Sequence, residues 1–425
     1  MPEPKDPISP KYPTSVVERF MNYVTVNTQS RENAGRFPST PGQLELLTQL
    51  KGELEILGLE DVSMDEHGYV MATIPATTDK RHVPTVGFVA HVDTSPESSG
   101  EDVKPILHRD YQGQDLVLPD DPSVVLRKAD DPALEKEIGR SLITASGKTL
   151  LGADDKAGVA EIVGAAEYLI AHPEIPHGEI RVAFTPDEEI GRGADFFDVG
   201  RFAAHCAYTL DGGAAGRLEF ESFSADSLSL TFRGFNTHPG YAKGSMVNSI
   251  KVAADFIHRL PKDQLSPETT EGHEGYVHPN VVEASVDRTV VRLLIRDFDT
   301  AKLAEKERWL QELAEETVQD WPGAAVDAEV QESYRNMREV LDQNPQVVEL
   351  AREALRRTGL EPQSPPIRGG TDGSRLSFMG LPTPNIFAGQ HGIHSRLEWA
   401  SVWEMHKAVE VIIELAKLWE EQAEG

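Results

Sequence analysis

Three short apolar runs, each followed by turn residues, constrain the fold of this chain more than any other feature. They are residues 86–92 (VGFVAHV), 181–185 (RVAFT) and 206–210 (CAYTL). Runs of this length with such flanks are typical of buried strands. Between the first two, residues 155–171 are rich in Ala and place apolar residues at helical spacing. Alternating strands and helices predict an α/β fold, with a mostly parallel sheet covered by helices on both faces.

From about Arg217 the pattern changes to strand, helix, two strands, helix, strand. These elements are expected at residues 227–232, 248–260, 281–286, 290–296, 300–321 and 325–331. This β-α-β-β-α-β order is ferredoxin-like, and a helix at 344–358 and a strand at 383–388 come after it. We therefore expect one discontinuous α/β domain, residues 1–218 and 334–425, with a smaller α+β domain inserted at 219–333. Ser401 and Glu404 predict a capping box at the start of the last helix.

Composition excludes several classes of protein. With 425 residues the chain is long for a single core, and its 39% hydrophobic and 26% charged residues are typical of a globular enzyme. A formal charge of −29 argues against nucleic acid or an anionic membrane as partners. No apolar stretch reaches the roughly 18 residues of a membrane helix, and the Pro-rich start resembles no secretion signal. The single cysteine, Cys206, is compatible with a cytoplasmic location.

Acidic residues and histidines gather where the predicted strands end. His91 and Asp93 are two residues apart, so their side chains leave an extended chain on the same side, where the carboxylate can fix the imidazole tautomer. Asp154 and Asp155 open the Ala-rich helix. Read singly, the first pair is an ordinary surface pair. The second is either a helix cap or a functional pair, since two adjacent acids are more than a cap requires. A carboxylate with two oxygens can also bridge two cations.

Three consecutive carboxylates, Asp187, Glu188 and Glu189, follow the second strand, and Asp211 ends the third. On an extended chain, Glu188 and Glu189 would point to opposite sides, so that one could bind a metal while the other faces a water. His391 and His394 lie near the end of the chain. Asp211 and these histidines, taken one at a time, are more simply read as turn residues or satisfied polar residues.

Together these residues predict a two-metal hydrolytic site. His91, Glu189 and Asp211 all fall at the carboxyl ends of predicted strands, where open parallel sheets bind ligands. The sequence has no cysteine cluster, so the ligands would be imidazole and carboxylate, which suits Zn²⁺ and also Co²⁺ or Mn²⁺. Asp154, Glu189 and Asp211 bring three negative charges; two divalent cations and a hydroxide would leave the centre near neutral.

Longer segments resemble the tripeptide aminopeptidases of the M20 metallopeptidase family. The resemblance runs from about Tyr23 to the last helix. It is carried by AHVDTSP from Ala90, LLGADDKAGVAEI from Leu150, TPDEEIGRG from Thr185, TLDGG from Thr209, NTHPGYAKGSMVNS from Asn236, EGHEGYVHPN from Glu271, IRDFD from Ile295, RGGTDGSRLSFMGLPTPNIF from Arg368 and HSRLE from His394. The first ligand segments are common among M20 enzymes, whereas EGHEGYVHPN and the segment from Arg368 resemble the tripeptide aminopeptidases more specifically.

The resemblance implies a role for each of these residues. Asp154 would bridge two Zn²⁺ ions, His91 and Asp211 would complete one, and Glu189 and His394 the other. Asp93 would orient His91, and the peptide bond between Asp154 and Asp155 would be cis. Around the last ligand the chain reads His394-Ser-Arg-Leu-Glu398, which departs from a frequent Gly and second basic residue but keeps the His-x-x-x-Glu spacing.

It also implies an activity, the removal of the N-terminal residue from short peptides, mainly tripeptides. Glu188 would act as general base, and His238 from the inserted lid domain would stabilise the oxyanion; in several relatives this histidine comes from a partner subunit. Arg296 and Arg368 are candidates for binding the peptide carboxylate, with structural salt bridges as the alternative. A homodimer through the inserted domain is expected. The alternatives are an M20 dipeptidase, carboxypeptidase or N-acyl-amino-acid deacylase, or a non-catalytic peptide-binding protein.

Overall fold

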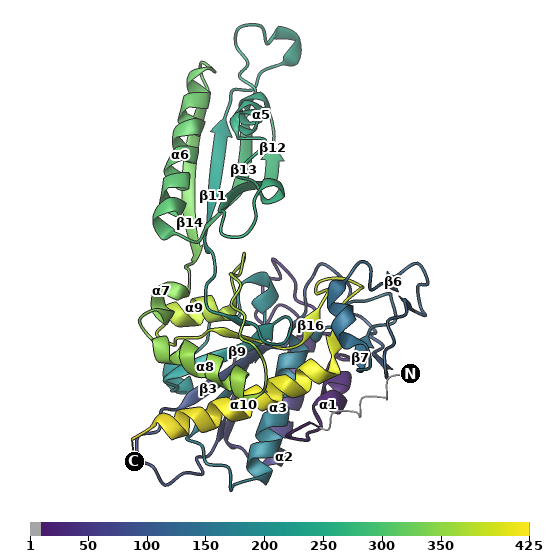
Figure 1. The fold of residues 1–425 in the computed structure, drawn as a ribbon. Helices are drawn as coiled ribbons and strands as arrows, with labels where there is room; N and C mark the ends of the chain where they lie inside the picture. Colours follow the sequence, from purple (N-terminus) through teal and green to yellow (C-terminus); the bar gives the residue numbers. More distant parts are fainter. Residues whose placement is uncertain (1–9, 425) are drawn as a thin grey trace. The chain divides into compact units, whose positions relative to one another are not determined.

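The computed structural model describes residues 10–424, and the chain divides into two compact units (Figure 1). The first takes in the chain up to Phe220, Glu339–Pro365 and the residues from Thr371 onward; the second takes in Glu221–Arg338 and Pro366–Gly370. The domain limits expected at 218/219 and 333/334 stay a prediction. The Pro-rich start, which bears on a secretion signal, lies outside the described residues. No helix among residues 10–424 is both long and apolar enough to span a membrane.

The large sheet of the first unit has the strand order β1-β2-β8-β3-β9-β15-β10. Its strands are β1 (Glu60–Met64), β2 (Val70–Ile74), β3 (Val86–His91), β8 (Ile180–Thr185), β9 (Cys206–Gly212), β10 (Leu218–Glu219) and β15 (Asn385–Phe387). The central pairings, β8 with β3, β3 with β9 and β9 with β15, are parallel, whereas the outer pairings are antiparallel. The predicted mostly parallel sheet is confirmed, with antiparallel pairing added at both sides.

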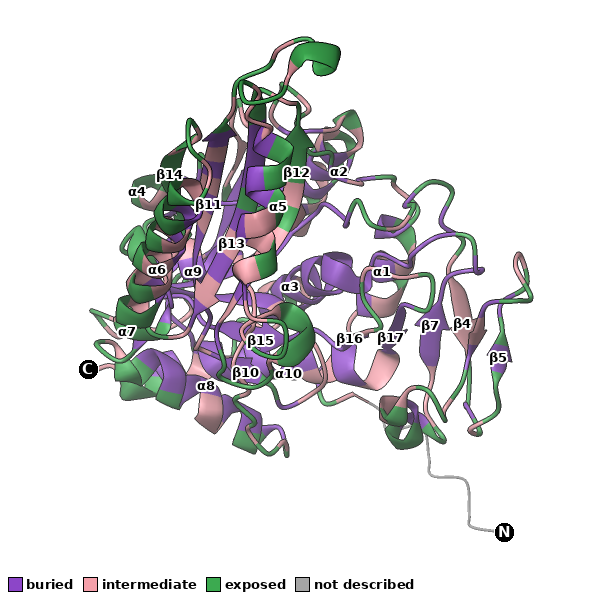
Figure 2. Ribbon diagram, turned by 90° about the horizontal axis from the view of Figure 1, so that it is seen from above, coloured by how far each residue is buried: buried purple, intermediate pink, exposed green. Residues whose placement is uncertain are grey.

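Helices cover both faces of this sheet. They are α1 (Val16–Tyr23), α2 (Pro41–Leu57), α3 (Ala153–Ala171), α4 (Val199–Phe202), α7 (Arg338–Leu341), α8 (Pro345–Arg357), α9 (Asp372–Phe378) and α10 (Val402–Gln422), with short 3₁₀ turns η1 (Pro132–Glu137) and η2 (Glu188–Ile190). The Ala-rich α3 contacts β3, β9, α1 and α10 and is buried over nearly its whole length (Figure 2). On the opposite face, Phe202 and Leu376 pack against Val89, Ala183 and Ala207.

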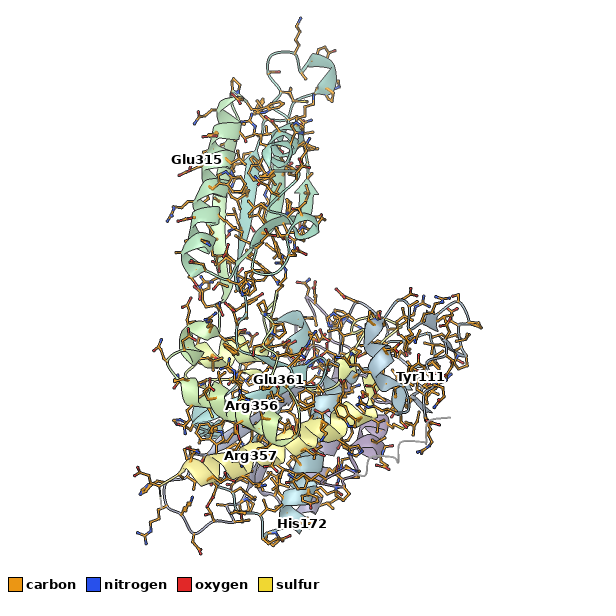
Figure 3. All side chains as sticks on the ribbon, in the orientation of Figure 1. Tyr111, His172, Glu315, Arg356, Arg357 and Glu361 are labelled. Atoms are coloured by element: carbon orange, nitrogen blue, oxygen red, sulfur yellow. The ribbon has the colours of Figure 1, made fainter. Side chains whose placement is uncertain are left out.

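The last turn of α8 shows how helices of the first unit are joined at the surface. It ends on the basic pair Arg356 and Arg357 (Figure 3), where positive charge is favourable beside the free carbonyl groups of a helix end. The guanidinium of Arg357 donates to the carboxylate of Glu421 on α10 at 2.9 and 2.7 Å. A two-point bond of this kind fixes direction as well as distance, so it holds the ends of α8 and α10 together.

A second, smaller sheet in the first unit was not expected from the sequence. Its order is β16-β17-β7-β4, all antiparallel, and β5 pairs with β6 beside it. The strands are β4 (Ile106–His108), β5 (Leu116–Val117), β6 (Val125–Leu126), β7 (Leu142–Thr144), β16 (Gln390–His391) and β17 (Trp399–Ser401). Strands of two or three residues are too short to show an alternating pattern. Trp399 belongs to a core cluster on this side together with Tyr111, which is labelled in Figure 3.

The second unit confirms the ferredoxin-like order. Its sheet, β12-β13-β11-β14, is antiparallel throughout. The elements are β11 (Ser224–Arg233), α5 (Ser249–Arg259), β12 (Tyr276–Ala284), β13 (Arg288–Asp297), α6 (Thr300–Gln319) and β14 (Ala325–Tyr334). Apolar residues of β11 and β13, including Leu230 and Leu293, form one core with α5 and α6. β12 begins at Tyr276, before the predicted residue 281, and its register with β13 shifts after Pro279, which cannot donate to the ladder.

Candidate metal centre

Three parallel strands bring acidic and histidine side chains to one edge of the large sheet. His91 is the last residue of β3, Glu189 follows β8 in η2, and Asp211 lies near the end of β9. Because β3 lies between β8 and β9, these three strand ends are neighbours. Asp154 comes from the start of α3, and His394 from the loop between β16 and β17.

Two clusters of possible ligands share Asp154. In the first, His91 Nε2 lies 3.1 Å from Asp154 Oδ1 and 3.8 Å from Asp211 Oδ1. In the second, His394 Nε2 lies 2.9 Å from Glu189 Oε2 and 3.3 Å from Asp154 Oδ2. In each cluster one ligand atom from every residue lies within 4.8 Å of the others. Asp154 therefore offers one oxygen to each cluster, which is the arrangement a bridging carboxylate requires.

The electrostatics of these clusters fit divalent cations. Burial, and then the nearby charge of Asp154, raise the pKa of Glu189 to about 8. Hydrogen bonds to Asp154 and Glu189 raise the pKa of His394 to about 11. Protons are thus strongly held where carboxylates crowd together, and a cation can take their place. Imidazole and carboxylate donors suit Zn²⁺, Mn²⁺ or Co²⁺.

Asp93 is fully buried behind His91 and makes more contacts than the sequence predicted. His91 Nδ1 lies 3.3 Å from Asp93 Oδ1 and 3.1 Å from the Asp93 carbonyl oxygen. The same carboxylate accepts the backbone N–H of Glu188 at 2.9 Å and that of Glu189 at 3.1 Å. One carboxylate thus joins β3 to the turn that carries both glutamates.

The turn carrying Glu188 and Glu189 corrects the expectation of an extended chain. Asp187 adopts a left-handed conformation with φ of 59°, and Glu188–Ile190 form the 3₁₀ turn η2. The two side chains therefore diverge because the chain turns and not because a strand alternates. Glu188 belongs to neither ligand cluster among the described residues, while Glu189 belongs to one. Desolvation raises the pKa of Glu188 well above its ordinary value, and the charges of Asp211 and Asp372 add to this shift.

The carboxylate of Asp187, the first of the run of three, is held by hydrogen bonds within the chain. Its carboxylate accepts the backbone N–H of Ser39 at 2.6 Å, the Ser39 hydroxyl, and the Gln43 amide at 2.7 Å. Its own backbone N–H donates to Gln43 Oε1 at 3.0 Å. Hydrogen bonds, and not cations, therefore compensate this charge.

Glu398, which was recognised as part of the His-x-x-x-Glu spacing but had no predicted role, holds the segment before α3. Its Oε2 accepts the N–H groups of Leu151 and Gly152, both at 2.7 Å, and its Oε1 accepts that of Asp154 at 3.0 Å. Burial raises the pKa of Glu398 to about 7. The peptide bond between Asp154 and Asp155 is cis, as the resemblance implied. The spacing from His394 to Glu398 was the signal that could have identified this residue.

His238, Arg296 and Arg368 lie in the second unit. His238 is exposed, and its Nδ1 accepts the N–H of Gly240 at 3.1 Å. Arg368 donates to the carbonyl oxygens of Gly272, Glu274 and Thr270 and to the Thr270 hydroxyl, at 2.8 to 3.3 Å. Arg296 donates only to the Arg368 carbonyl, at 3.2 Å, and its buried Nε has no partner among the described residues.

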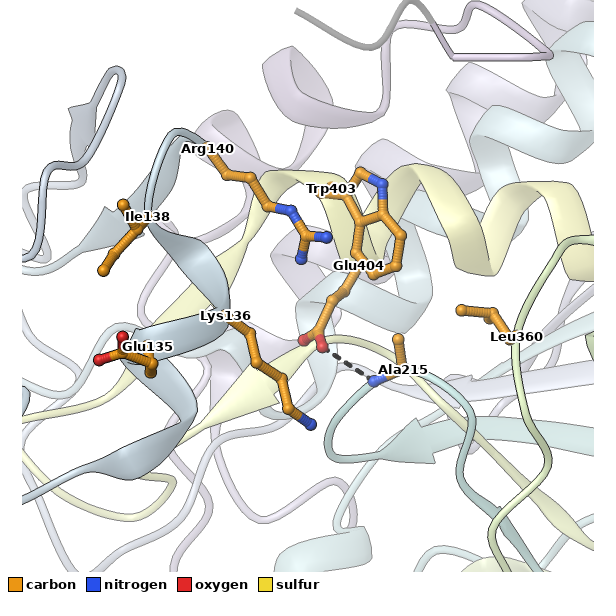
Figure 4. A pocket seen from close by; sticks show the side chains of 8 residues that line it. All are labelled: Glu135, Lys136, Ile138, Arg140, Ala215, Leu360, Trp403 and Glu404. Atoms are coloured by element: carbon orange, nitrogen blue, oxygen red, sulfur yellow. Dashed lines mark hydrogen bonds between the residues drawn. The ribbon is translucent and has the colours of Figure 1, made fainter. Parts of the chain in front are cut away.

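Glu404 corrects the predicted capping box. Ser401 Oγ accepts the Glu404 N–H at 3.3 Å, but the reciprocal bond is absent among the described residues. The Glu404 carboxylate instead accepts the Ala215 N–H at 2.9 Å (Figure 4) and lies 2.6 Å from His391 Nε2. It thereby ties together the loops that follow Asp211 and precede His394. Glu404 also lines a cavity of about 580 Å³ that contains none of the predicted ligands; its other lining residues are Glu135, Lys136, Ile138, Arg140, Ala215, Leu360 and Trp403.

Known proteins are similar to this chain in sequence and in fold. Residues 150–418 match the family model for peptidase family M20/M25/M40. Peptidase T of Geobacillus kaustophilus is 50% identical over 408 residues, which cover 96% of this chain and 99% of that protein. The crystal structure of the aminopeptidase PepT from Bacillus cereus superposes with a TM-score of 0.75 at 25% identity, covering 95% of this chain and 98% of the other. A tripeptidase structure from Staphylococcus aureus gives a TM-score of 0.76 at 23% identity, covering 96% and 98%.

The level of identity decides what these likenesses establish. Half of the aligned residues are shared with a peptidase T over almost the full length of both chains. The ligand clusters around Asp154 lie within this shared length, and four of their five residues lie within the region that the family model matches. The chain therefore belongs to the M20 peptidases and, within them, to the peptidase T family.

Proposed function

We propose that this chain is a tripeptide aminopeptidase in which Glu188 is the general base and Asp154 is shared between two metal ions. The observation that carries the proposal is the pair of ligand clusters with Asp154 in common. The relatives support the substrate, since the chain is 50% identical to a peptidase T and shares its fold with a tripeptidase. His91 and Asp211 complete one metal site, and Glu189 and His394 the other.

The donor set favours Zn²⁺ at both sites, with Co²⁺ or Mn²⁺ as substitutes. When bound, two such cations polarise the scissile carbonyl and lower the pKa of a water molecule toward neutrality. The three carboxylates of Asp154, Glu189 and Asp211 balance most of the added positive charge.

Glu188 carries the proton in this reaction. It belongs to neither ligand cluster among the described residues, so its carboxylate stays available for proton transfer. Asp93 fixes its backbone through the N–H at 2.9 Å, which positions the side chain without using it. The desolvation that raises its pKa favours holding the proton taken from the attacking water until the leaving amine accepts it.

Recognition of the substrate is proposed for the second unit. Arg296 is the stronger candidate for the peptide carboxylate, because its Nε has no partner within residues 10–424 and its guanidinium lies near the rings of Tyr276 and Tyr334. Arg368 is the weaker candidate because its donors are already bound to chain oxygens. His238 is exposed and would stabilise the oxyanion.

A homodimer and a cytoplasmic location complete the proposal. The edge strand β14 of the second unit is ten residues long and mostly exposed, and it carries the half-exposed Val330. An unpaired edge of this kind can pair with a second copy. Sedimentation equilibrium would detect the dimer, and a monomer at micromolar concentration would contradict it.

Cys206 is buried and free, which agrees with a reducing compartment.

A substrate panel tests the activity. The purified chain, with zinc measured by mass spectrometry, is given a free tripeptide, the same tripeptide N-acetylated, a dipeptide and an N-acyl amino acid. We expect rapid release of the first residue from the free tripeptide alone, and loss of that release after chelation. Equal cleavage of the acetylated tripeptide would contradict the assignment as an aminopeptidase, and faster cleavage of the acyl amino acid would indicate a deacylase.

A further inference from the structure

The loop after β3 reaches His394 from the side opposite to the ligand cluster. Glu97 Oε2 lies 3.2 Å from His394 Nδ1, and Ser98 Oγ donates to the His394 carbonyl oxygen at 3.0 Å. The other ring nitrogen, Nε2, faces Asp154 and Glu189 at 3.3 and 2.9 Å. His394 is thus held at its backbone and at one ring nitrogen, while its second nitrogen points into the cluster.

This loop is itself fixed on both sides of Glu97. The side-chain amide of Gln29 donates to the carbonyl oxygens of Ser95 at 3.3 Å and Ser98 at 2.9 Å. The Glu97 N–H donates to Ser95 Oγ at 3.3 Å. A carboxylate on a loop anchored in this way loses less conformational freedom on binding His394 than one on a free loop.

The backbone of His394 is unusual as well. Its φ of 60° lies in the left-handed region, which residues other than Gly rarely adopt. A histidine that binds a cation through Nε2 carries its proton on Nδ1, and a carboxylate acceptor at Nδ1 fixes that tautomer. Glu97 stands to His394 as Asp93 stands to His91, whose Nδ1 lies 3.3 Å from Asp93 Oδ1.

We propose that Glu97 and Ser98 are positioning residues that hold His394 in the tautomer and orientation needed to bind a metal ion. The loop after β3 then prepares both metal histidines, His91 through Asp93 and His394 through Glu97. The inference rests on the proposed role of His394 as a ligand. Glu97 is not itself a member of either cluster among the described residues, since it contacts the far nitrogen of the ring. Its side chain is 68% exposed, so the alternative is a solvated charge without effect on the metals.

Zinc affinity measured by competition with a chromophoric chelator tests the proposal on the full chain. We expect Glu97→Gln to weaken one of the two sites by about 10- to 100-fold, with the other unchanged. Glu97→Asp should restore part of the loss, and Ser98→Ala should weaken the same site by a smaller factor. Glu101→Gln is the matched control, because Glu101 is an exposed acid of the same loop. Far-ultraviolet circular dichroism verifies that every variant is folded.

Two reference variants separate the outcomes. His394→Ala should abolish the site that Glu97→Gln weakens, and Asp211→Asn, which changes a member of the other cluster only, should weaken the other. Unchanged affinity at both sites in Glu97→Gln overturns the positioning role while leaving the ligand assignment intact. Two tight zinc sites in His394→Ala would overturn the ligand assignment itself. As a second measurement, kcat of Glu97→Gln at limiting zinc should be low and should recover with added zinc, whereas KM should stay the same.

Discussion

Glu398 Oε1 accepts the backbone N–H of Asp154 at 3.0 Å, which connects the end of the chain to the residue shared by both ligand clusters. Its other oxygen accepts two more N–H groups just before α3, so a single buried carboxylate orders the whole approach to Asp154. The position of Asp154 therefore depends on a residue that lies outside both clusters among the described residues.

We expect Glu398→Ala to lower the free energy of unfolding by at least about 3 kcal/mol, because it leaves three buried N–H groups without an acceptor. Zinc affinity should fall at both sites, since Asp154 serves both. Urea unfolding and chelator competition measure the two effects. Glu361→Ala is the control, because Glu361 is an exposed glutamate of the same unit (Figure 3). A variant as stable as the control would contradict the role of Glu398.

The sharing of Asp154 predicts different metal contents for two aspartate variants. Asp211 belongs to one cluster only, so Asp211→Asn should retain about one tightly bound zinc ion per chain. Asp154→Asn replaces one of the two carboxylate oxygens by an amide nitrogen and removes the negative charge that both clusters share, so it should weaken both sites. Mass spectrometry of the dialysed proteins gives the zinc content. Equal retention of zinc by the two variants would show that Asp154 does not bridge.

The sequence predicted elements that have clear periodicity or clear ends. Three of the five candidate ligands could be grouped because parallel strands end at one edge of a sheet, and the ferredoxin-like order followed from strand and helix lengths. Contacts between distant segments could not be predicted in this way. The sequence around Glu404 does not show whether its side chain binds Ala215 and His391, as it does, or completes a capping box.

The same limit applies to the run of three carboxylates. The sequence predicted an extended chain there, because an apolar strand precedes it. The left-handed Asp187, bound by Ser39 and Gln43, turns the chain, and that pairing spans about 150 positions of sequence. Asp93 was predicted as a partner of His91, two residues away, but its bonds to Glu188 and Glu189 depend on tertiary structure.

The two arginines that are candidates for binding the peptide carboxylate should differ in what their alanine variants change, which is stability for Arg368 and KM for Arg296. Arg368→Ala removes four hydrogen bonds to residues 270–274 and should lower the free energy of unfolding by about 2 kcal/mol or more. Among the described residues, Arg296→Ala removes one hydrogen bond and two contacts with aromatic rings, so stability should fall less than in Arg368→Ala. The KM of Arg296→Ala for a tripeptide should rise by about 10- to 100-fold, since a charge-assisted bond to a carboxylate is worth about 1.5–3 kcal/mol. An unchanged KM in Arg296→Ala would contradict its substrate role.

Glu414 predicts a pH dependence of stability away from the metal site. Its carboxylate accepts from Lys11 Nζ at 2.6 Å, Tyr12 Oη at 2.7 Å and Lys417 Nζ at 3.0 Å. Burial opposes ionisation, but these hydrogen bonds prevail and lower the pKa of Glu414 from 4.5 to about 2. A carboxyl with a depressed pKa in the folded state stabilises it above the unfolded pKa, and that contribution is lost as the pH falls through the folded value.

The stability difference between the wild-type chain and Glu414→Gln should therefore be full above about pH 5 and should shrink as the pH falls from about 4.5 toward 2. Urea unfolding with the metals removed by a chelator avoids the separate effect of metal release. Glu361→Gln should show no such pH dependence. A difference that stays constant from pH 6 to pH 3 would mean that the contacts of Glu414 do not depend on its charge.

Glu188 gives the most direct test of the division of labour between the two adjacent glutamates. Glu188 lies outside both ligand clusters and Glu189 within one, so Glu188→Gln should retain both zinc ions whereas Glu189→Gln should lose one. Loss of a general base lowers kcat by about 10²- to 10⁴-fold, and we expect KM to change little because Glu188 is not needed to hold the substrate. Mass spectrometry and tripeptide hydrolysis, measured on the same preparations, separate metal loss from loss of the base. Near-normal kcat in zinc-loaded Glu188→Gln would refute the assignment, since no other carboxylate in η2 is free of a ligand role.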